Sequence, residues 1–363
     1  MVKNNTIRVV QLIDSLEAGG AERMAVNYAN LLHRKLGFSA LITTRSEGQL
    51  KKQLENDIVY LFLNKKKIID IKALNHFKNF VHKYEISHIH AHSSSVFFAV
   101  LLKLIIPKIK IIWHDHYGKS EMLNNRPKLA LQIASFFVSS IISVNQNLKK
   151  WAFEQLFCKN IVYLPNFIGE SLEFFIDATN LHGVSGKRIV CLANLRPQKN
   201  HHFLLKVAKE IKKSHPEFTF HLVGKDFNDK YSQSIKDEIS NLSLTDSVFV
   251  YGSREDISNI LKQSDIGILT SSSEGLPIAI LEYGFHKLPI VATSVGQIPK
   301  VIDSGEGILV ESNNVEGFIE GLKIIIENTK LKKSLANSIH SKIINNFSEK
   351  AVFKLYIDCI NEK

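Results

Sequence analysis

The chain has 363 residues, more than the roughly 300 that one hydrophobic core usually supports, so two domains are expected. Hydrophobic residues make up 45% of the sequence, against 18 Gly and 8 Pro, which excludes an intrinsically disordered chain. Three widely spaced cysteines argue against a disulfide framework or a thiolate zinc site, and a reducing cytoplasm is expected.

The net charge of +11 is unevenly distributed. Residues 1–168 hold 23 Lys/Arg and 11 Asp/Glu, whereas residues 169–363 hold 23 and 24. A basic half beside a neutral half predicts that one domain meets an anionic surface or substrate, although a lysine-rich solvated surface is an equal alternative. The most apolar region, residues 96–113, is interrupted by Lys103, Pro107, Lys108 and Lys110, so it is expected to be a buried helix, a stop and a strand rather than a membrane span.

Short apolar runs alternate with amphipathic segments throughout the first half, which predicts strands alternating with helices. Strands are expected at 7–13, 39–44, 58–63, 86–92, 108–116 and 141–144, and helices at 21–36, 68–84, 95–106 and 127–140. Residues 168–187 lack a clean period and end in Gly and Ser, which indicates an interdomain linker.

A second alternating series follows. Strands are expected at 188–195, 218–224, 247–252, 266–272, 289–293 and 307–310, with helices at 200–216, 231–244, 256–264, 277–287 and from 315 onward. Such alternation predicts an α/β fold of two doubly wound Rossmann-like domains facing a central cleft, where ligands bind beyond the carboxyl ends of the strands. The expected division is residues 1–167, residues 168–340, and a C-terminal helix at 341–363 that packs back on the first domain.

Two carboxylates stand beside the turn in "TSSSEGLPIAILEYG", residues 270–284. Glu274 precedes a Gly-Leu-Pro turn, and Glu282 lies in an apolar run where an unpaired charge would cost several kcal/mol. Eight residues of helix rise about 12 Å and advance about 80°, so both are expected along one broad side of a helix. That spacing suits an extended ligand with hydroxyls at both ends and phosphate between them, such as a nucleoside-diphosphate sugar. A capping glutamate with a structural ion pair is the alternative.

Two cations occupy another strand-end loop of the same domain. "ANLRPQKNHHFLL" places Arg196 and Lys199 after the first strand of that domain and directly before a helix. A guanidinium and an ammonium there can neutralise a diphosphate leaving group, while surface solvation is the alternative for either cation alone.

These segments resemble a known family. "EGLPIAILEYG" is similar to the E-x7-E signature of retaining glycosyltransferases of family four, which have the GT-B fold, and "LRPQKN" resembles their Arg/Lys phosphate loop. Five further segments resemble family motifs in the family's order: "LEAGGAERMAVNYANLL", "ISHIHAHSS", "IIWHDHYG", "YLPNFI" and "IVATSVGQIPKVI". The resemblance extends along the whole chain.

The resemblance implies a role for each matching residue. Glu274 would contact the donor sugar, Glu282 the ribose, and Arg196 and Lys199 the diphosphate. Gly275, Leu276, Pro277 and Ile278 would line the donor, Gly19 and Gly20 would let the first domain approach its phosphates, His116 would stand at the reacting centre, and the backbone at Arg254 would border the base. In many relatives the arginine stands two places earlier, where this chain has Asn194, and "HDH" leaves His114 as a rival to His116.

The histidines also raise the question of a metal. His88, His90 and His92 share one face of an expected strand, and His114 and His116 share a face of another, so their imidazoles could bind zinc. No carboxylate stands at a ligand spacing, and no Asp-x-Asp motif is present to hold a divalent ion on a diphosphate. We therefore expect no metal and no other cofactor.

The resulting expectation is a retaining, metal-independent glycosyltransferase. It would move a sugar from a UDP- or GDP-linked donor to a glycan or lipid-linked acceptor in the assembly of a bacterial surface polysaccharide such as lipopolysaccharide or capsule. The basic first domain would receive the acceptor and would contact anionic lipid at the inner face of the cytoplasmic membrane. The alternatives are a catalytically silent sugar-nucleotide-binding protein and a nicotinamide-dependent oxidoreductase, although "DSLEAGGAER" lacks the G-x-G-x-x-G loop of the latter. Nucleic-acid binding is disfavoured because no aromatic-plus-basic motif is present.

Overall fold

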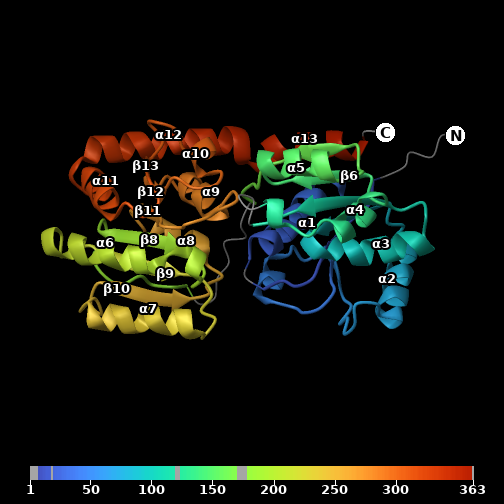
Figure 1. Ribbon diagram of the computed structural model, residues 1–363, viewed down its shortest axis with the longest axis horizontal. Coiled ribbons are helices and arrows are strands. Elements are labelled where there is room, and N and C mark those ends of the chain that lie inside the picture. Colours follow the sequence, from blue (N-terminus) through green and yellow to red (C-terminus); the bar gives the residue numbers. More distant parts are fainter. Residues whose placement is uncertain (1–6, 18, 119–122, 170–177, 362–363) are drawn as a thin grey trace. The chain divides into compact units, whose positions relative to one another are not determined.

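The computed structural model describes residues 7–17, 19–118, 123–169 and 178–361. The chain forms two compact units (Figure 1). The first unit comprises residues 1–170 together with 348–363, and the second comprises residues 171–347. Part of the expected linker, residues 170–177, lies outside the described residues.

The first unit is built on a sheet of seven parallel strands in the order β3-β2-β1-β4-β5-β6-β7. The strands are β1 (Val9–Ile13), β2 (Ser39–Thr43), β3 (Val59–Phe62), β4 (His88–His92), β5 (Lys110–Asp115), β6 (Ser140–Ser143) and β7 (Ile161–Tyr163). The helices are α1 (Gly20–Leu36), α2 (Ile71–Lys83), α3 (Val96–Ile105), α4 (Leu129–Ser135), α5 (Gln146–Gln155) and α13 (Glu349–Asn361). Short 3₁₀ turns lie at Gln49–Gln53, Ser93–Ser95 and Leu123–Asn125.

The two faces of this sheet differ in chemistry. Val10, Leu12, Ile89, Ile111 and Trp113 form part of one fully apolar core. The other face carries imidazoles from β4 and β5, which pack against Tyr28 of α1 and Tyr356 of α13.

The C-terminal helix α13 belongs to the first unit. Glu349 forms an ion pair with Arg34 of α1, and the Tyr356 hydroxyl lies 3.2 Å from His90 Nδ1. Near the end of the helix, Asn160 donates a hydrogen bond of 3.2 Å to the Cys359 carbonyl. The last helix is thereby tied to the first helix, to the central strand β4 and to the loop before β7.

The second unit repeats the plan with six parallel strands in the order β10-β9-β8-β11-β12-β13. The strands are β8 (Arg188–Leu192), β9 (Thr219–Val223), β10 (Val248–Gly252), β11 (Ile266–Leu269), β12 (Ile290–Thr293) and β13 (Ile308–Val310). The helices are α6 (His201–Ser214), α7 (Lys230–Asn241), α8 (Ile257–Lys262), α9 (Ile278–Phe285), α10 (Ile298–Val301), α11 (Val315–Glu327) and α12 (Thr329–Phe347), and a 3₁₀ turn spans Pro197–Lys199.

These two sheets confirm the expected fold class of two doubly wound Rossmann-like domains. The apolar region at 96–113 is α3, a stop at Pro107 and β5, as predicted. Helix α5 was missed because "QNLKKWAFEQ" is mostly polar, and it begins where the Asn145 side chain accepts the Leu148 N–H at 2.8 Å. No helix among the described residues combines the length and apolarity needed to cross a membrane.

Strand order fixes where ligands meet each sheet. In the second unit the order reverses direction between β8 and β11, which are adjacent in the sheet. Ligands of doubly wound sheets bind outside the carboxyl ends of the strands at such a reversal. Lys199 follows β8 and Glu274 follows β11, so both lie at the carboxyl ends of the two strands that flank the reversal.

Candidate active site

Lys199 and Glu274 meet at the carboxyl end of the second sheet. The Lys199 ammonium forms an ion pair with Glu274 Oε1, and the Ser271 hydroxyl donates to the same oxygen at 2.6 Å. The Glu274 side chain is only 6% exposed and that of Lys199 18%. A buried carboxylate is thus held by an ammonium and a hydroxyl.

The backbone around Glu274 is fixed by neighbouring loops. The Ser272 N–H donates to the Gln198 carbonyl at 2.8 Å, which joins the Glu274 loop to the Lys199 loop. Gly296 lies against this loop with φ +58, and a Cβ on it would stand 1.8 Å from the Glu274 carbonyl oxygen. Only glycine suits both the left-handed backbone and the close approach.

Tyr283 of α9 anchors the helix to the sheet. Its hydroxyl accepts the Leu192 N–H at 2.6 Å and donates to the Ile268 carbonyl at 3.1 Å, so it joins the ends of β8 and β11. Its ring packs over Gly267, where a Cβ would meet the ring at 2.5 Å. These contacts hold α9 against β8 and β11, the two strands that Lys199 and Glu274 follow.

Sequence reasoning missed several of these residues. Ser271 was noted only as part of a polar turn, yet its hydroxyl holds Glu274, and the Thr293 hydroxyl holds the Ser271 carbonyl at 2.6 Å. The Thr270 hydroxyl donates to the Lys199 carbonyl at 3.1 Å. These partners lie 22 and 71 residues apart along the chain, so no local pattern reveals them.

The structure places Arg196 apart from the Lys199–Glu274 pair. Its guanidinium carbon lies 4.6 Å from the centroid of the Phe227 ring, in the loop after β9. The Asn194 side chain, at the position where many relatives have arginine, accepts the Lys225 N–H of that same loop at 2.8 Å. Asn194 therefore fixes the loop that carries Phe227, and Arg196 extends over it.

The expected helical relation between Glu274 and Glu282 is wrong. Helix α9 begins only at Ile278, after Pro277 in an extended conformation (φ −71, ψ 126), so residues 274–277 form a loop. The helical rise and turn assumed for the whole interval therefore do not apply. Glu282 is half-buried in the middle of α9, whereas Glu274 is held in the loop by Lys199 and Ser271.

The other donor-lining residues occupy the turn and a neighbouring loop. Gly275 is half-buried, Leu276 is 5% exposed, and Ile278 is the first residue of α9. Arg254 follows β10, and its guanidinium donates to the adjacent Ser253 carbonyl at 3.3 Å. An open pocket beside Arg254 is lined by β10 and residues 178–182, and none of the other predicted site residues lines it.

In the first unit, the predicted glycine loop forms the start of α1. Gly19 is the N-cap, with an extended backbone (φ −163, ψ 162), and its carbonyl accepts the Arg23 N–H at 3.0 Å. Gly20 is exposed as the first residue of this 17-residue helix. The free N–H groups of a helix start are suited to an anionic ligand.

Four imidazoles, which we call the histidine quartet, lie in the first unit: His90, His92, His114 and His116. Their rings stack along each strand, with centroids 4.4 Å apart for His90 and His92 and 4.0 Å apart for His114 and His116. Across the strands, His90 Nε2 lies 3.1 Å from His114 Nδ1, and His92 Nδ1 lies 3.0 Å from His116 Nε2. The quartet is therefore hydrogen-bonded in pairs.

The quartet consists of neutral imidazoles. Burial lowers the pKa values of His90, His92 and His114 well below the usual range, and it lowers the pKa of His116 to about 3. His114 is fully buried, whereas His116 follows the end of β5 and is partly exposed. Of the two histidines in "HDH", only His116 can be reached by a ligand.

Ring nitrogens of His90, His92 and His114 lie within 4.8 Å of one another and could in principle hold a metal ion. A metal lies in the plane of each imidazole that binds it. The rings of His90 and His92 are stacked rather than convergent, with an interplanar angle of 29°, and five of the six ring nitrogens of the three histidines are paired with other side chains. The arrangement therefore favours a hydrogen-bonded network over a coordination site.

Solved structures share this architecture. A glycosyltransferase from Rickettsia africae superposes with a TM-score of 0.75 at 20% identity, covering 99% of this chain and 100% of that one. HepE of Anabaena, solved with UDP and glucose, superposes with a TM-score of 0.79 at 17% identity, covering 98% and 99%. The fold is that of GT-B glycosyltransferases, with two Rossmann-like domains.

Sequence comparisons identify the family. "Glycosyltransferase Family 4" matches residues 18–172, and "Glycosyl transferases group 1" matches residues 175–341. The UDP-Gal:alpha-D-GlcNAc-diphosphoundecaprenol alpha-1,3-galactosyltransferase of Escherichia coli is 26% identical over 98% of this chain and 97% of its own length. The chain belongs to glycosyltransferase family four, and it is an enzyme of this class.

Proposed function

We propose that this glycosyltransferase transfers a hexose from a UDP-sugar to a lipid-linked glycan acceptor, with retention of configuration and without a metal ion. The observation that carries the proposal is the buried Lys199–Glu274–Ser271 cluster at the strand reversal of the second sheet. It combines a cation for phosphate with a carboxylate for sugar hydroxyls, the two groups that a nucleoside-diphosphate sugar requires.

Donor binding rearranges this cluster. Without a ligand, Lys199 neutralises Glu274. In our proposal the diphosphate takes the ammonium, and hydroxyls of the sugar donate to the Glu274 carboxylate, so each charge exchanges one partner for another. The exchange keeps Glu274 compensated throughout, which matters because an isolated buried carboxylate is costly.

The same groups lower the barrier to transfer. Cleavage of the sugar–phosphate bond places positive charge on the anomeric carbon and negative charge on the departing phosphate. Lys199 is fixed in place by Glu274 before the reaction and stabilises the developing negative charge. This cationic side chain supplies what a divalent ion would otherwise supply. Arg196 would add to it once drawn from Phe227 to the phosphate.

The proposed nucleotide and acceptor rest on relatives. The Escherichia coli relative is named for UDP-Gal and a diphosphoundecaprenol-linked acceptor, and the Anabaena neighbour was solved with UDP and glucose. We extend the UDP donor and the polyprenol-linked acceptor to this chain, because the first of these relatives spans nearly its whole length.

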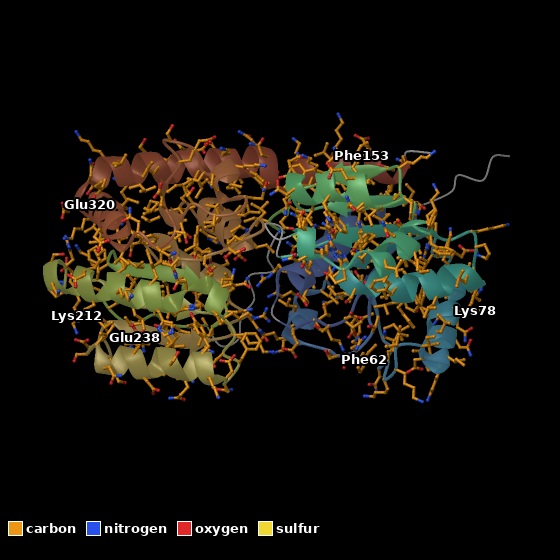
Figure 2. The ribbon with its side chains drawn as sticks, viewed as in Figure 1. Phe62, Lys78, Phe153, Lys212, Glu238 and Glu320 are labelled. Carbon is orange, nitrogen blue, oxygen red and sulfur yellow. The ribbon has the colours of Figure 1, made fainter. Side chains whose placement is uncertain are left out.

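An exposed apolar surface supports the proposal that the protein contacts the inner face of the cytoplasmic membrane. Helices α4 and α5 lie side by side, since Gln132 of α4 donates a hydrogen bond of 2.9 Å to the Gln155 carbonyl of α5. Just beyond the two helices, the rings of Phe136 and Phe157 stack 4.2 Å apart. The α4–α5 patch, defined by five apolar side chains that are 53–76% exposed, consists of Leu129, Ile133, Phe136, Phe153 and Phe157. Figure 2 shows Phe153 at the surface of the first unit.

Lysines accompany the α4–α5 patch. Lys128, Lys150 and Lys159 are exposed on or beside the same helices. Apolar side chains with neighbouring lysines suit the interface of a bilayer that contains anionic lipid, where each lysine contributes about 1 kcal/mol. A Phe136→Ser/Phe153→Ser variant should float with anionic liposomes at least fivefold less than the wild type. Ile324→Ser, which changes a 48% exposed residue of the second unit, is the matched control. Unchanged flotation of the double variant would remove the membrane proposal.

The donor assignment is tested by a thermal-shift screen of nucleotide sugars. A ligand that binds the folded state raises the unfolding temperature by mass action. UDP-sugars should stabilise the wild type without added metal and in the presence of EDTA, and should stabilise Glu274→Ala less. Stabilisation by GDP-sugars alone would show that the donor carries GDP rather than UDP. A strict requirement for Mg²⁺ would overturn the metal-independent mechanism.

A further inference from the structure

Four strand ends of the first sheet bring polar side chains together. Asp14 follows β1, Arg45 follows β2, Lys65 follows β3 and Ser94 follows β4. The strand order of this sheet reverses direction between β1 and β4, so these residues lie at the reversal and beside it. Ligands of doubly wound sheets bind outside the carboxyl ends of the strands at such a point. The first sheet therefore has a ligand position of its own.

Hydrogen bonds join the strand ends to one another. The Arg45 N–H donates to the Asp14 carbonyl at 2.9 Å, and the Lys65 N–H donates to the Thr44 carbonyl at 2.6 Å. The Thr44 hydroxyl donates to Asp14 Oδ1, and the Ser94 hydroxyl donates to Asp14 Oδ2 at 2.6 Å. The segments after β1, β2, β3 and β4 are thus fixed relative to one another, and so are the backbones that carry the two cations.

The two cations of this cluster differ in their partners. Arg45 Nε lies 3.6 Å from Asp14 Oδ1, and the Arg45 side chain is 57% exposed. Lys65 is only 9% exposed, and among the residues that the structure describes no carboxylate lies within ion-pair distance of its ammonium. Burial, together with the Arg45 guanidinium, lowers the pKa of Lys65, and Asp14 and Asp70 offset only part of that shift. A buried ammonium beside a second cation is costly unless an anion joins it.

The structural contacts of Lys65 do not replace an anion. Its ammonium lies 4.9 Å from the centroid of the Phe98 ring, in a cation–π contact. Asp70 is the N-cap of α2, where its carboxylate accepts the N–H groups of Ala73 and Lys66, each at 3.1 Å. The ring carries no net charge, and the Asp70 carboxylate serves the start of the helix, so neither group neutralises the ammonium by direct contact.

We propose that Lys65 and Arg45 bind the diphosphate of the lipid-linked acceptor at the carboxyl end of the first sheet. This inference rests on the proposed function for the nature of the acceptor. A guanidinium binds phosphate oxygens as a planar fork and an ammonium binds them as a point charge, so the two cations can each take one phosphate. A diphosphate supplies the anion that Lys65 lacks, whereas the neutral end of a glycan does not.

Kinetics with two acceptors that differ only in the diphosphate test this site. One acceptor is GlcNAc joined to farnesol through a diphosphate, and the other is the farnesyl glycoside of GlcNAc. The wild type should show a KM at least about tenfold lower for the first acceptor. Lys65→Met and Arg45→Met should each raise that KM by about tenfold, the value of one charged hydrogen bond. The KM for the neutral acceptor, the KM for the UDP-sugar and kcat should all remain unchanged.

Lys67→Met is the matched control. Lys67 is exposed two residues further along the same segment, so this variant loses the same charge without touching the buried site. Its KM for the diphosphate acceptor should equal that of the wild type, and a rise equal to that of Lys65→Met would overturn the site. A rise in Lys65→Met confined to the KM for the UDP-sugar would assign the cation to the donor instead. Weaker flotation of Lys65→Met with anionic liposomes, at an unchanged acceptor KM, would assign it to a lipid headgroup; both outcomes overturn the proposal.

Binding without turnover separates this inference from the proposed function. Calorimetry with the diphosphate acceptor, in saturating UDP, should give a Kd about tenfold higher for Lys65→Met than for the wild type. If the wild type transfers no sugar but binds the acceptor with this dependence on Lys65, the proposed function fails and the diphosphate site stands. Normal transfer with an unchanged acceptor KM in both variants would overturn the site and leave the proposed function standing. Should Lys65→Met fail to fold, Arg45→Met and the wild-type preference between the two acceptors still decide.

Discussion

Replacing Lys199 by methionine removes the cation but keeps most of the apolar length of the side chain. Glu274 would then retain the Ser271 hydroxyl but lose its ion pair. Removing one partner of a fully buried pair costs about 3–5 kcal/mol, whereas an exposed pair is worth at most about 1 kcal/mol. With side chains 18% and 6% exposed, this pair lies between those limits. We expect the free energy of unfolding to fall by about 2 kcal/mol.

The same substitution should affect transfer more than stability. Loss of one preorganised charge at a developing anion lowers kcat by about 10²–10³-fold. Urea denaturation measures the loss of stability. Initial rates with labelled donor measure the loss of transfer, at a temperature where the variant is fully folded. Lys187→Met is the control. Lys187 stands just before β8, the strand that Lys199 follows, and it pairs with Glu217, with both side chains more than 40% exposed.

The double variant Lys199→Met/Glu274→Gln separates charge from packing. Once the carboxylate is neutral, the missing ammonium leaves no buried charge, so the double variant should be more stable than Lys199→Met alone. It should still be inactive. The reasoning is refuted if Lys199→Met retains transfer within twofold of the wild type, or if its stability loss equals that of Lys187→Met.

Three further predictions concern other parts of the structure. Gly296→Ala should abolish transfer and lower the unfolding temperature by several degrees in calorimetry, because its Cβ would stand 1.8 Å from the Glu274 carbonyl; wild-type behaviour would contradict the left-handed turn. Burial lowers the pKa values of His90 and His114, so the unfolded state binds more protons below pH 6.5 and stability is lost as pH falls. At pH 5.5 each of these two histidines should lower the free energy of unfolding by about 1.4 kcal/mol relative to pH 7.5, as measured by urea denaturation. Equal free energies of unfolding at the two pH values would refute this. Glu282→Ala should weaken UDP binding in calorimetry by about tenfold, and unchanged affinity would remove its ribose role.

The local sequence pattern was sufficient to predict the strands of the two sheets. Alternating apolar and amphipathic runs identified every strand except the short β7, since strand period and helix period differ clearly in this chain. The meeting of Lys199 with Glu274 could also be anticipated, because both follow parallel strands whose carboxyl ends share one edge of the sheet.

Contacts between distant loops could not be read from the sequence. Gly296 and Tyr283 act on segments 22 and 91 residues away, and neither stands in a spacing that marks such a role. The helical rise between Glu274 and Glu282 was wrongly assumed, because it was applied from Glu274 although the expected helix begins only at Pro277 and the observed one at Ile278. The contact of Gln11 with His92 could not be read from the sequence either, because Gln11 stands in the middle of an apolar strand.

The most direct test of the central claim is the rate of sugar transfer from a radiolabelled UDP-hexose to a diphosphoundecaprenol-linked acceptor, with the wild type and Glu274→Ala compared in EDTA. The account predicts transfer by the wild type in the absence of metal and a loss of at least about 10²-fold in the variant. Equal rates for the two folded proteins would contradict it, since the carboxylate held by Lys199 and Ser271 would then have no part in the reaction.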